Sequence, residues 1–133
     1  MKTSELRTNS DINERLYITR DSYTHLIYQL VEKIKLYEKR FDCVYGVPRG
    51  GLIPAVYISY QLNIPLKTYL NLNENVLIVD DICDTGKTFS NIKKDSKGFL
   101  KFATLFKHKD CDFNVDFYVE ENDKWIVFPY END

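Results

Sequence analysis

Short apolar runs alternate with longer amphipathic stretches along most of this chain. The runs are typical of strands and lie at 16–19, 43–47, 66–70, 76–79, 101–107 and 115–119. Apolar residues at helical spacing predict helices at 22–39, 52–62 and 86–95. Asp21 or Ser22 is expected to cap the first of them. Strands and helices alternate from residue 43 onward, which predicts an α/β fold with a doubly wound, mainly parallel sheet.

The run Val76–Val79 is the most informative of these strands. Four consecutive apolar residues predict a strand that is buried on both faces of a parallel sheet. The run ends in two acids, Asp80 and Asp81, whose side chains point to opposite sides of the strand. Two adjacent carboxylates repel each other unless something offsets their charge. A Mg²⁺ ion or a pair of sugar hydroxyls would do so.

A polar loop and a helix start follow the two acids directly. Asp84, Thr85, Gly86, Lys87 and Thr88 span this junction. Free N–H groups and the positive end of the helix dipole make a helix start a ready site for an anion. The stretch 80–88 therefore offers carboxylates for a ribose or a metal and donors for a phosphate. A ribose 5-phosphate carries both features.

Three other interpretations of this stretch fit its residues less well. A phosphate loop of the GxxxxGK[ST] type would need glycine where Asp81 stands. An EF-hand loop needs oxygen ligands at alternate positions, and Ile82 breaks that pattern. Simple helix capping explains one aspartate but not three.

A second loop, Pro48–Gly51, follows the run 43–47. Arg49 can bind a phosphate through two hydrogen bonds, and Gly50 and Gly51 let the backbone approach a ligand closely. Taken alone, the loop is an ordinary βα turn with an exposed arginine. Beside the acidic stretch, the interpretation as a pyrophosphate loop is favoured, because parallel strands bring their carboxyl ends to one edge of the sheet.

Composition limits the classes of function. The chain has 133 residues, 44% of them hydrophobic and 29% charged, with a net charge of −2. One domain spanning 1–133 is expected, with residues 1–15 as a loose arm or a short cap. Neither nucleic-acid binding nor membrane insertion is expected. Three scattered cysteines without a CxxC pair make metal ligation by thiolates improbable and favour the cytoplasm.

The stretch 76–88 resembles the phosphoribosyl pyrophosphate (PRPP) motif of type I phosphoribosyltransferases. The loop at 47–54 is similar to the family's pyrophosphate loop, and 125–131 resembles the base-binding segment of its purine branch, especially the xanthine–guanine enzymes. The resemblance runs from about residue 17 to residue 131. It implies the type I fold with a small hood formed by the N- and C-terminal segments.

The same resemblance implies a reaction and a set of residue roles. A purine base, expected to be a 6-oxopurine such as xanthine, guanine or hypoxanthine, would take the phosphoribosyl group from PRPP and release pyrophosphate, with Mg²⁺ as cofactor. Asp84 would be the catalytic acid/base. The implied PRPP-binding residues are Arg49, Gly50, Asp80, Asp81, Asp84, Thr85, Gly86, Lys87 and Thr88, with Asp81 closest to the metal, and the implied base-binding residues are Lys107, Trp125 and Ile126. A homo-oligomer, either a dimer or a tetramer, is expected as well.

One departure from the family keeps alternatives open. Only residues 71–75 separate the run 66–70 from the central strand, where family members usually carry a longer loop that shields the active site. Lys67 is the nearest basic residue, but its spacing does not match the family's pyrophosphate contact. A PRPP- or nucleotide-sensing regulator, or a transferase for another nitrogenous acceptor, therefore remain the alternatives.

Overall fold

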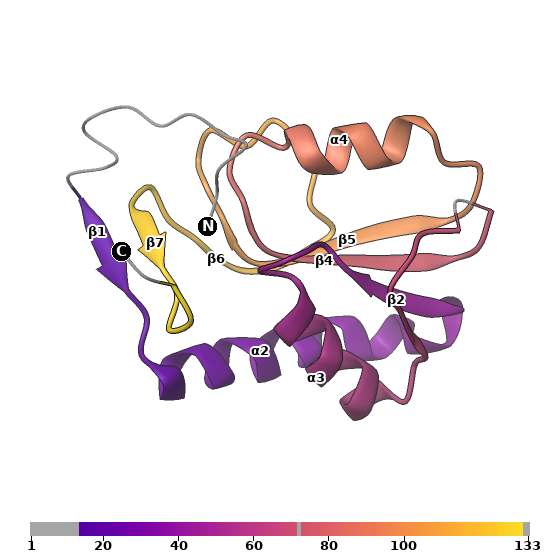
Figure 1. Cartoon of the computed structure of the whole chain (residues 1–133), viewed down its shortest axis with the longest axis horizontal. Coiled ribbons are helices and arrows are strands. Elements are labelled where there is room, and N and C mark those ends of the chain that lie inside the picture. The colour runs from indigo at the N-terminus through magenta and orange to yellow at the C-terminus, as the bar shows by residue number, and fades with distance from the viewer. Residues whose placement is uncertain (1–13, 72, 132–133) are drawn as a thin grey trace.

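A single parallel sheet forms the centre of the molecule. The computed structural model describes residues 14–71 and 73–131. Five parallel strands lie in the order β3-β2-β4-β5-β6, with the predicted central strand in the middle (Figure 1). Their bounds are β2 Cys43–Gly46, β3 Leu66–Lys67, β4 Val76–Cys83, β5 Leu100–Lys107 and β6 Phe117–Glu121. The predicted parallel α/β sheet is confirmed.

Helices cover both faces of this sheet. Helix α2 (Arg20–Ile34) and helix α3 (Leu52–Leu62) lie on one face, and helix α4 (Lys87–Lys94) lies on the other (Figure 1). The core is correspondingly split into two clusters, because successive residues of a strand point to opposite faces. Leu77 and Val79 pack on the side of α2 and α3, whereas Val76 and Ile78 pack on the side of α4.

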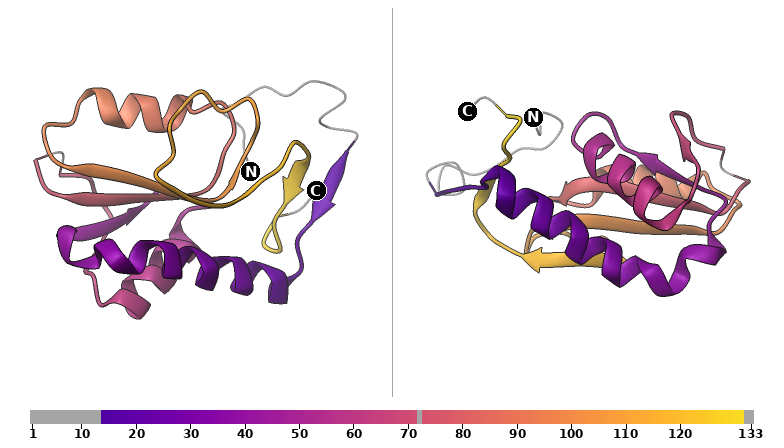
Figure 2. Two further views of the ribbon diagram at one scale, coloured as in Figure 1. Left: turned by 180° about the vertical axis from the view of Figure 1, so that it is seen from behind. Right: turned by 90° about the horizontal axis from the view of Figure 1, so that it is seen from below.

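A second, two-stranded sheet forms the predicted hood. Strand β1 (Arg15–Tyr17) pairs in parallel with β7 (Trp125–Val127), and Leu16 is opposite Ile126. Figure 2 shows this small sheet beyond the carboxyl ends of the central strands. The two ends of the described chain thus meet above the edge where the predicted ligand residues lie. Most of the expected arm at 1–15 falls outside the described residues.

Several predicted element bounds are wrong. Thr19, not Asp21 or Ser22, caps α2, since its hydroxyl accepts the amide hydrogen of Ser22 at 3.1 Å. Helix α2 stops at Ile34 and continues as a 3₁₀ helix, η1 (Lys35–Arg40), in which no residue is buried. Helical spacing alone does not reveal that this last stretch has no core to face.

The strands differ from prediction too. Strand β4 continues beyond residue 79 to Cys83, because its last residues still pair with Phe106 and Lys107 of β5. Strand β6 begins two residues later than expected, because the Asp116 carboxylate accepts the amide hydrogen of Phe102 at 2.8 Å and holds the chain just before the strand. Among the described residues, no helix is both long and apolar enough to cross a bilayer.

Candidate active site

The adjacent acids of β4 lie in different environments. Asp80 is half-buried, and its Oδ1 accepts the amide hydrogen of Asp81 at 2.8 Å. The Asp81 side chain is only 1% exposed. The Tyr130 hydroxyl, from the C-terminal segment, donates a hydrogen bond to Oδ2 of Asp81. The two predicted ligands are therefore together, but Asp81 is covered by a residue that the sequence analysis did not single out.

The predicted pyrophosphate loop lies against the same carboxylate. The amide hydrogen of Val47 bonds to Val79 of β4 at 2.8 Å, which fixes the loop to the central strand. A Cβ atom on Gly50 would collide with the Asp81 carboxylate, so a larger residue there would displace this carboxylate. Arg49 is exposed, and the peptide bond that precedes it is cis. The structure thus brings Arg49 and Gly50 to the acids, as expected from parallel strands.

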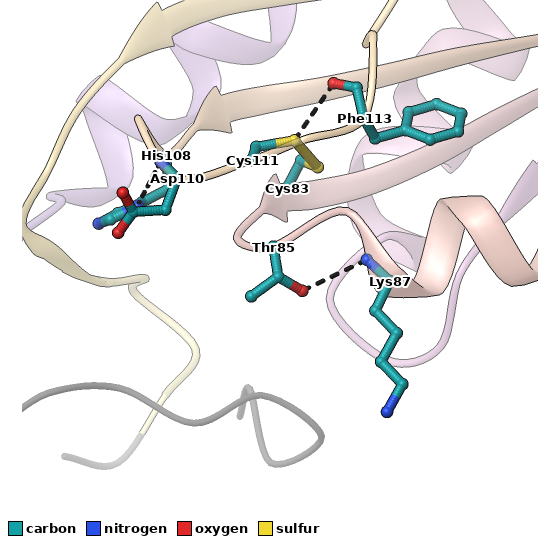
Figure 3. The surroundings of a disulfide bond; sticks show 7 residues. All are labelled: Cys83, Thr85, Lys87, His108, Asp110, Cys111 and Phe113. Carbon is teal, nitrogen blue, oxygen red and sulfur yellow. Dashed lines mark hydrogen bonds and ion pairs between the residues drawn. A yellow bond between two sulfur atoms is a disulfide. The ribbon is translucent and has the colours of Figure 1, made fainter.

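The predicted phosphate-binding turn leads into α4. Gly86 has a φ of 92°, a left-handed conformation that favours glycine, and a Cβ atom there would lie 2.6 Å from Cβ of Phe113. The Thr85 hydroxyl accepts the amide hydrogen of Lys87 at 3.3 Å. Figure 3 shows the Lys87 side chain extending away from the turn. Thr85 and Lys87 are exposed at this helix start, where the positive end of the helix dipole favours an anion.

A loop from the β5–β6 connection supports this turn from behind. Cys83 and Cys111 form a disulfide bond, with Cα atoms 6.1 Å apart (Figure 3). The Asp112 amide donates to the Thr85 carbonyl at 3.1 Å. This link could not be predicted from the sequence, because the two cysteines are 28 residues apart and share no diagnostic spacing. The phosphate-binding turn is therefore held by a covalent bond and a hydrogen bond to one loop.

His108 anchors the same loop at its start. Its amide donates to the Cys83 carbonyl at 2.9 Å, and the side chain is buried. Nδ1 accepts the Asp110 amide hydrogen at 3.2 Å, so Nε2 carries the proton and donates to the Asp123 carbonyl at 2.9 Å. The imidazole thus ties the loop behind the turn to the segment that precedes β7.

The predicted base-binding residues come from β5 and β7. Lys107 is the register partner of Cys83, next to Asp84, and its Nζ lies 5.4 Å from the centre of the Tyr118 ring. Asp84 is 5% exposed. Trp125 is half-buried, and the Ile126 side chain is part of the core.

The backbone of β7 gives Ile126 a particular orientation. The Trp125 amide bonds to Glu14 and the Val127 carbonyl to Ile18, both at 2.9 Å, so these residues face β1. Alternate residues of a strand direct their N–H and C=O groups to opposite sides. The backbone groups of Ile126 therefore point to the edge of β7 that β1 does not occupy.

Two other features lie apart from these residues. Lys67 forms an ion pair with Glu74, with 3.0 Å between Nζ and each carboxylate oxygen, and this contact raises the pKa of the lysine. This ion pair joins the two ends of the short connection and engages the Lys67 ammonium.

A cavity of about 560 Å³ lies between α2, β1 and the ends of β5 and β6, and its walls include Phe106, His25 and Glu120. Phe106 and Lys107 point to opposite faces, so this cavity is not the predicted base site.

Comparison with known proteins decides the family. The crystal structure of a purine phosphoribosyltransferase from Pyrococcus horikoshii is 35% identical, with a TM-score of 0.78 over 90% of this chain and 95% of that one. The xanthine-guanine phosphoribosyltransferase of Cereibacter sphaeroides is 30% identical over an alignment of 114 residues, and the match covers 66% of this chain and 68% of that enzyme. The chain belongs to the purine phosphoribosyltransferase family.

More distant matches agree with this family only at the level of fold. The xanthine-guanine-hypoxanthine phosphoribosyltransferase of Helicobacter pylori is 16% identical, with a TM-score of 0.72 over 86% of this chain and 92% of that one. No protein-family model matches the chain. The resemblance seen in the stretch 76–88 is confirmed, and so is the assignment of this phosphoribosyltransferase as an enzyme.

Proposed function

We propose that this phosphoribosyltransferase transfers the 5-phosphoribosyl group of PRPP to a 6-oxopurine and releases pyrophosphate. Xanthine, guanine and hypoxanthine are the candidate bases. The observation that carries the proposal is the meeting, at one edge of the sheet, of the Asp80–Asp81 pair, the Arg49 loop and the start of α4. These groups match the ribose, the pyrophosphate and the 5-phosphate of a single PRPP molecule.

Each part of PRPP has a complementary group in this arrangement. Asp80 and Asp81 would accept hydrogen bonds from the ribose hydroxyls. The turn from Thr85 through Gly86 and Lys87 to Thr88 would hold the 5-phosphate through N–H groups and hydroxyls. The guanidinium of Arg49 and the backbone of Gly50 would hold the pyrophosphate. Most of the acceleration would then come from positioning and charge complementarity.

The residues present fit a Mg²⁺ ion that arrives with PRPP. Within the described ranges, no cluster of three or more His, Cys, Asp or Glu side chains could hold a metal without a ligand. Mg²⁺ typically takes one or two carboxylates and completes its shell with phosphates and water. Asp81, with Asp80 beside it, supplies that number. The bound metal would offset the charge that develops on the leaving pyrophosphate.

The base would bind between β5 and β7. Trp125 would stack on the ring, and the outward backbone groups of Ile126 would meet its polar edge. Lys107 would donate to the 6-oxo group, because it is the last residue of β5 and pairs with Cys83, the residue before Asp84. Asp84 would exchange the proton of the attacking base nitrogen as a general acid/base. The buried position of Asp84 restricts competing exchange with water.

A homo-oligomer is part of the proposal. One side of α3 exposes Leu52, Ile53, Val56 and Tyr60, and the Tyr60 side chain is 83% exposed. Tyr28 of α2 is exposed too, and its ring contacts that of Tyr57 of α3. Contiguous exposed apolar side chains commonly mark a contact with another protein. A second copy of this chain is the proposed partner. Helix α3 directly follows the Arg49 loop, so an interface on α3 would stabilise the conformation of this loop.

The proposed compartment is the cytoplasm. The composition of the chain favours it, whereas the Cys83–Cys111 disulfide weighs against it, since such bonds are rare in reducing compartments. Labelling of the free thiols in protein taken directly from cells would show whether this pair is reduced there.

The test is a panel of free bases incubated with the enzyme, PRPP and Mg²⁺, with nucleotide formation measured by chromatography. Xanthine, guanine and hypoxanthine should yield nucleotide, and adenine, uracil and orotate should yield far less. Product from a non-purine base alone would refute the proposed substrate. PRPP binding in calorimetry without any product would instead favour the regulatory alternative.

A further inference from the structure

The carboxylate that PRPP would need is covered by the other end of the chain. Asp81 is 1% exposed, with the Gly50 backbone against it, and the Tyr130 hydroxyl donates to its Oδ2. Tyr130 lies 49 residues further along the chain and belongs to the segment that carries the proposed base-binding residues. Oδ2 of Asp81 thus accepts a hydrogen bond from the C-terminal segment. In the proposed function, the same carboxylate would bind the ribose or its metal.

The C-terminal turn holds this hydroxyl in place. The Glu131 amide bonds to the Phe128 carbonyl, and the Phe128 amide bonds to the Glu131 carboxylate, both at 3.0 Å. The Tyr130 ring is parallel to the Phe128 ring, with 5.6 Å between centroids. Tyr23 of α2 packs edge-on against the Tyr130 ring at 5.8 Å. The contact with Asp81 therefore comes from a built turn and not from a loose side chain.

The hydroxyl stays a hydrogen-bond donor under ordinary conditions. Burial raises the pKa of Tyr130 strongly, and the nearby Tyr23, Glu131 and Asp80 raise it further. The phenol is therefore neutral, and its O–H group donates a hydrogen bond to Oδ2 of Asp81. A buried carboxylate needs such a donor, because its charge is otherwise costly.

We propose that Tyr130 is a latch that closes over Asp81 in the free enzyme and opens when PRPP and Mg²⁺ bind. This inference rests on the proposed function, because it needs PRPP at Asp81. Opening breaks the hydrogen bond from Tyr130 and replaces it with bonds from the ligand, and no proton changes hands. Trp125 and Ile126 belong to the same segment as Tyr130. When PRPP binds and Tyr130 is released, the position of these two base-binding residues therefore changes as well.

Calorimetric titration with PRPP in the presence of Mg²⁺ tests the latch. Tyr130→Phe keeps the ring and its packing but removes the competing hydroxyl. It should bind PRPP roughly tenfold more tightly than the wild type, as expected for loss of a competing hydrogen bond to a charged group. Tyr23→Phe is the matched control: it removes a buried hydroxyl of the same aromatic cluster that has no partner among the described atoms. Its affinity should stay within about twofold.

The fluorescence of Trp125, the single tryptophan of the chain, gives a second readout. PRPP with Mg²⁺, without a base, should change the emission of the wild type. In Tyr130→Phe the change should be smaller, because the hydrogen bond to Asp81 that PRPP would have to break is already absent. Equal or weaker PRPP binding by Tyr130→Phe, or unchanged emission in saturated wild type, would overturn the latch while leaving the proposed function intact. A wild type that does not bind PRPP at all would refute the proposed function and the latch with it.

Discussion

At the scale of the residue, Asp84 carries the most specific chemical prediction. It is buried at the junction of β4 and α4, next to the strand position that pairs with Lys107. Asp84→Asn keeps the shape of the side chain but removes its ability to take a proton. We expect turnover to fall by about 10²- to 10⁴-fold, the usual contribution of a general acid/base.

The same variant should keep its affinity for PRPP within a few-fold of wild type, because asparagine keeps the size of the side chain and an oxygen acceptor, and the ribose and 5-phosphate contacts proposed above come from Asp80, Asp81 and residues 85–88. Steady-state kinetics and calorimetry measure the two quantities separately. Full activity in Asp84→Asn would remove this residue from catalysis, whereas loss of PRPP binding would mean that it acts in binding.

Trp125 carries the corresponding prediction for the base. Trp125→Ala removes the proposed stacking surface, and stacking of a base on an aromatic ring contributes about 1–3 kcal/mol. We therefore expect the KM for the base to rise by roughly ten- to a hundredfold, with little change in the KM for PRPP. Trp125→Phe, which restores a ring, is the control and should recover most of the affinity. Parallel increases in both KM values would show that Trp125 only supports the fold.

The positions of some site residues could be predicted from the sequence, whereas the contacts of others could not. Asp80, Asp81 and Gly86 could be predicted, because a buried strand followed by a helix start dictates where their atoms point. Tyr130 could not be predicted as a partner of Asp81, since its contact depends on how the C-terminal turn packs on Tyr23. Contacts made through tertiary packing leave no local pattern in the sequence.

At the scale of the element, the β5–β6 connection is more than a link between strands. It supports the phosphate-binding turn through the Cys83–Cys111 disulfide, which closes a loop with a sequence separation of 28. A cross-link over such a length stabilises a protein by roughly 3–4 kcal/mol in the chain-entropy account. Cys111→Ser should therefore lower the free energy of unfolding by about that amount.

Urea titration with and without a dithiol reductant measures this effect. The reductant should lower the stability of the wild type to the level of Cys111→Ser, and it should not affect the variant. Equal stability of the wild type under both conditions would show that the bond does not form in solution.

The elements themselves were predictable to different degrees. The strand at 76–79 and the helix at 52–62 were found because apolar periodicity reports burial directly, and α3 has the predicted bounds. The end of α2 was not predicted correctly, because the exposed segment η1 also contains apolar residues, Leu36 and Tyr37. Periodicity predicts that an element exists more reliably than it predicts where the element ends.

At the scale of the whole molecule, the hood and the sheet enclose the site from two sides. Strand β7 returns from the end of the chain to pair with β1, which places the base-binding segment above the carboxyl ends of the central strands (Figure 2). The connection between β3 and β4 is short, and the Lys67–Glu74 ion pair joins its two ends, so it offers few residues to cover the site. Shielding of the reaction is therefore expected from the C-terminal segment or from a second subunit.

Assembly is the property of the whole molecule that most needs a test. The exposed residues Leu52, Ile53, Val56 and Tyr60 lie along one side of α3, directly after the Arg49 loop. A lysine in the middle of such a contact would be buried without a partner, which is strongly unfavourable. Val56→Lys should therefore shift the protein from an oligomer to a monomer in analytical ultracentrifugation.

Gln61→Lys adds the same charge at an exposed position of α3 outside that stripe, so it should leave the mass unchanged. Circular dichroism should show that both variants keep the fold of the wild type. If the interface braces the pyrophosphate loop, Val56→Lys should weaken PRPP binding and Gln61→Lys should not. A wild type that sediments as a monomer, or a Val56→Lys variant that keeps its oligomeric mass, would show that this face of α3 does not join two copies.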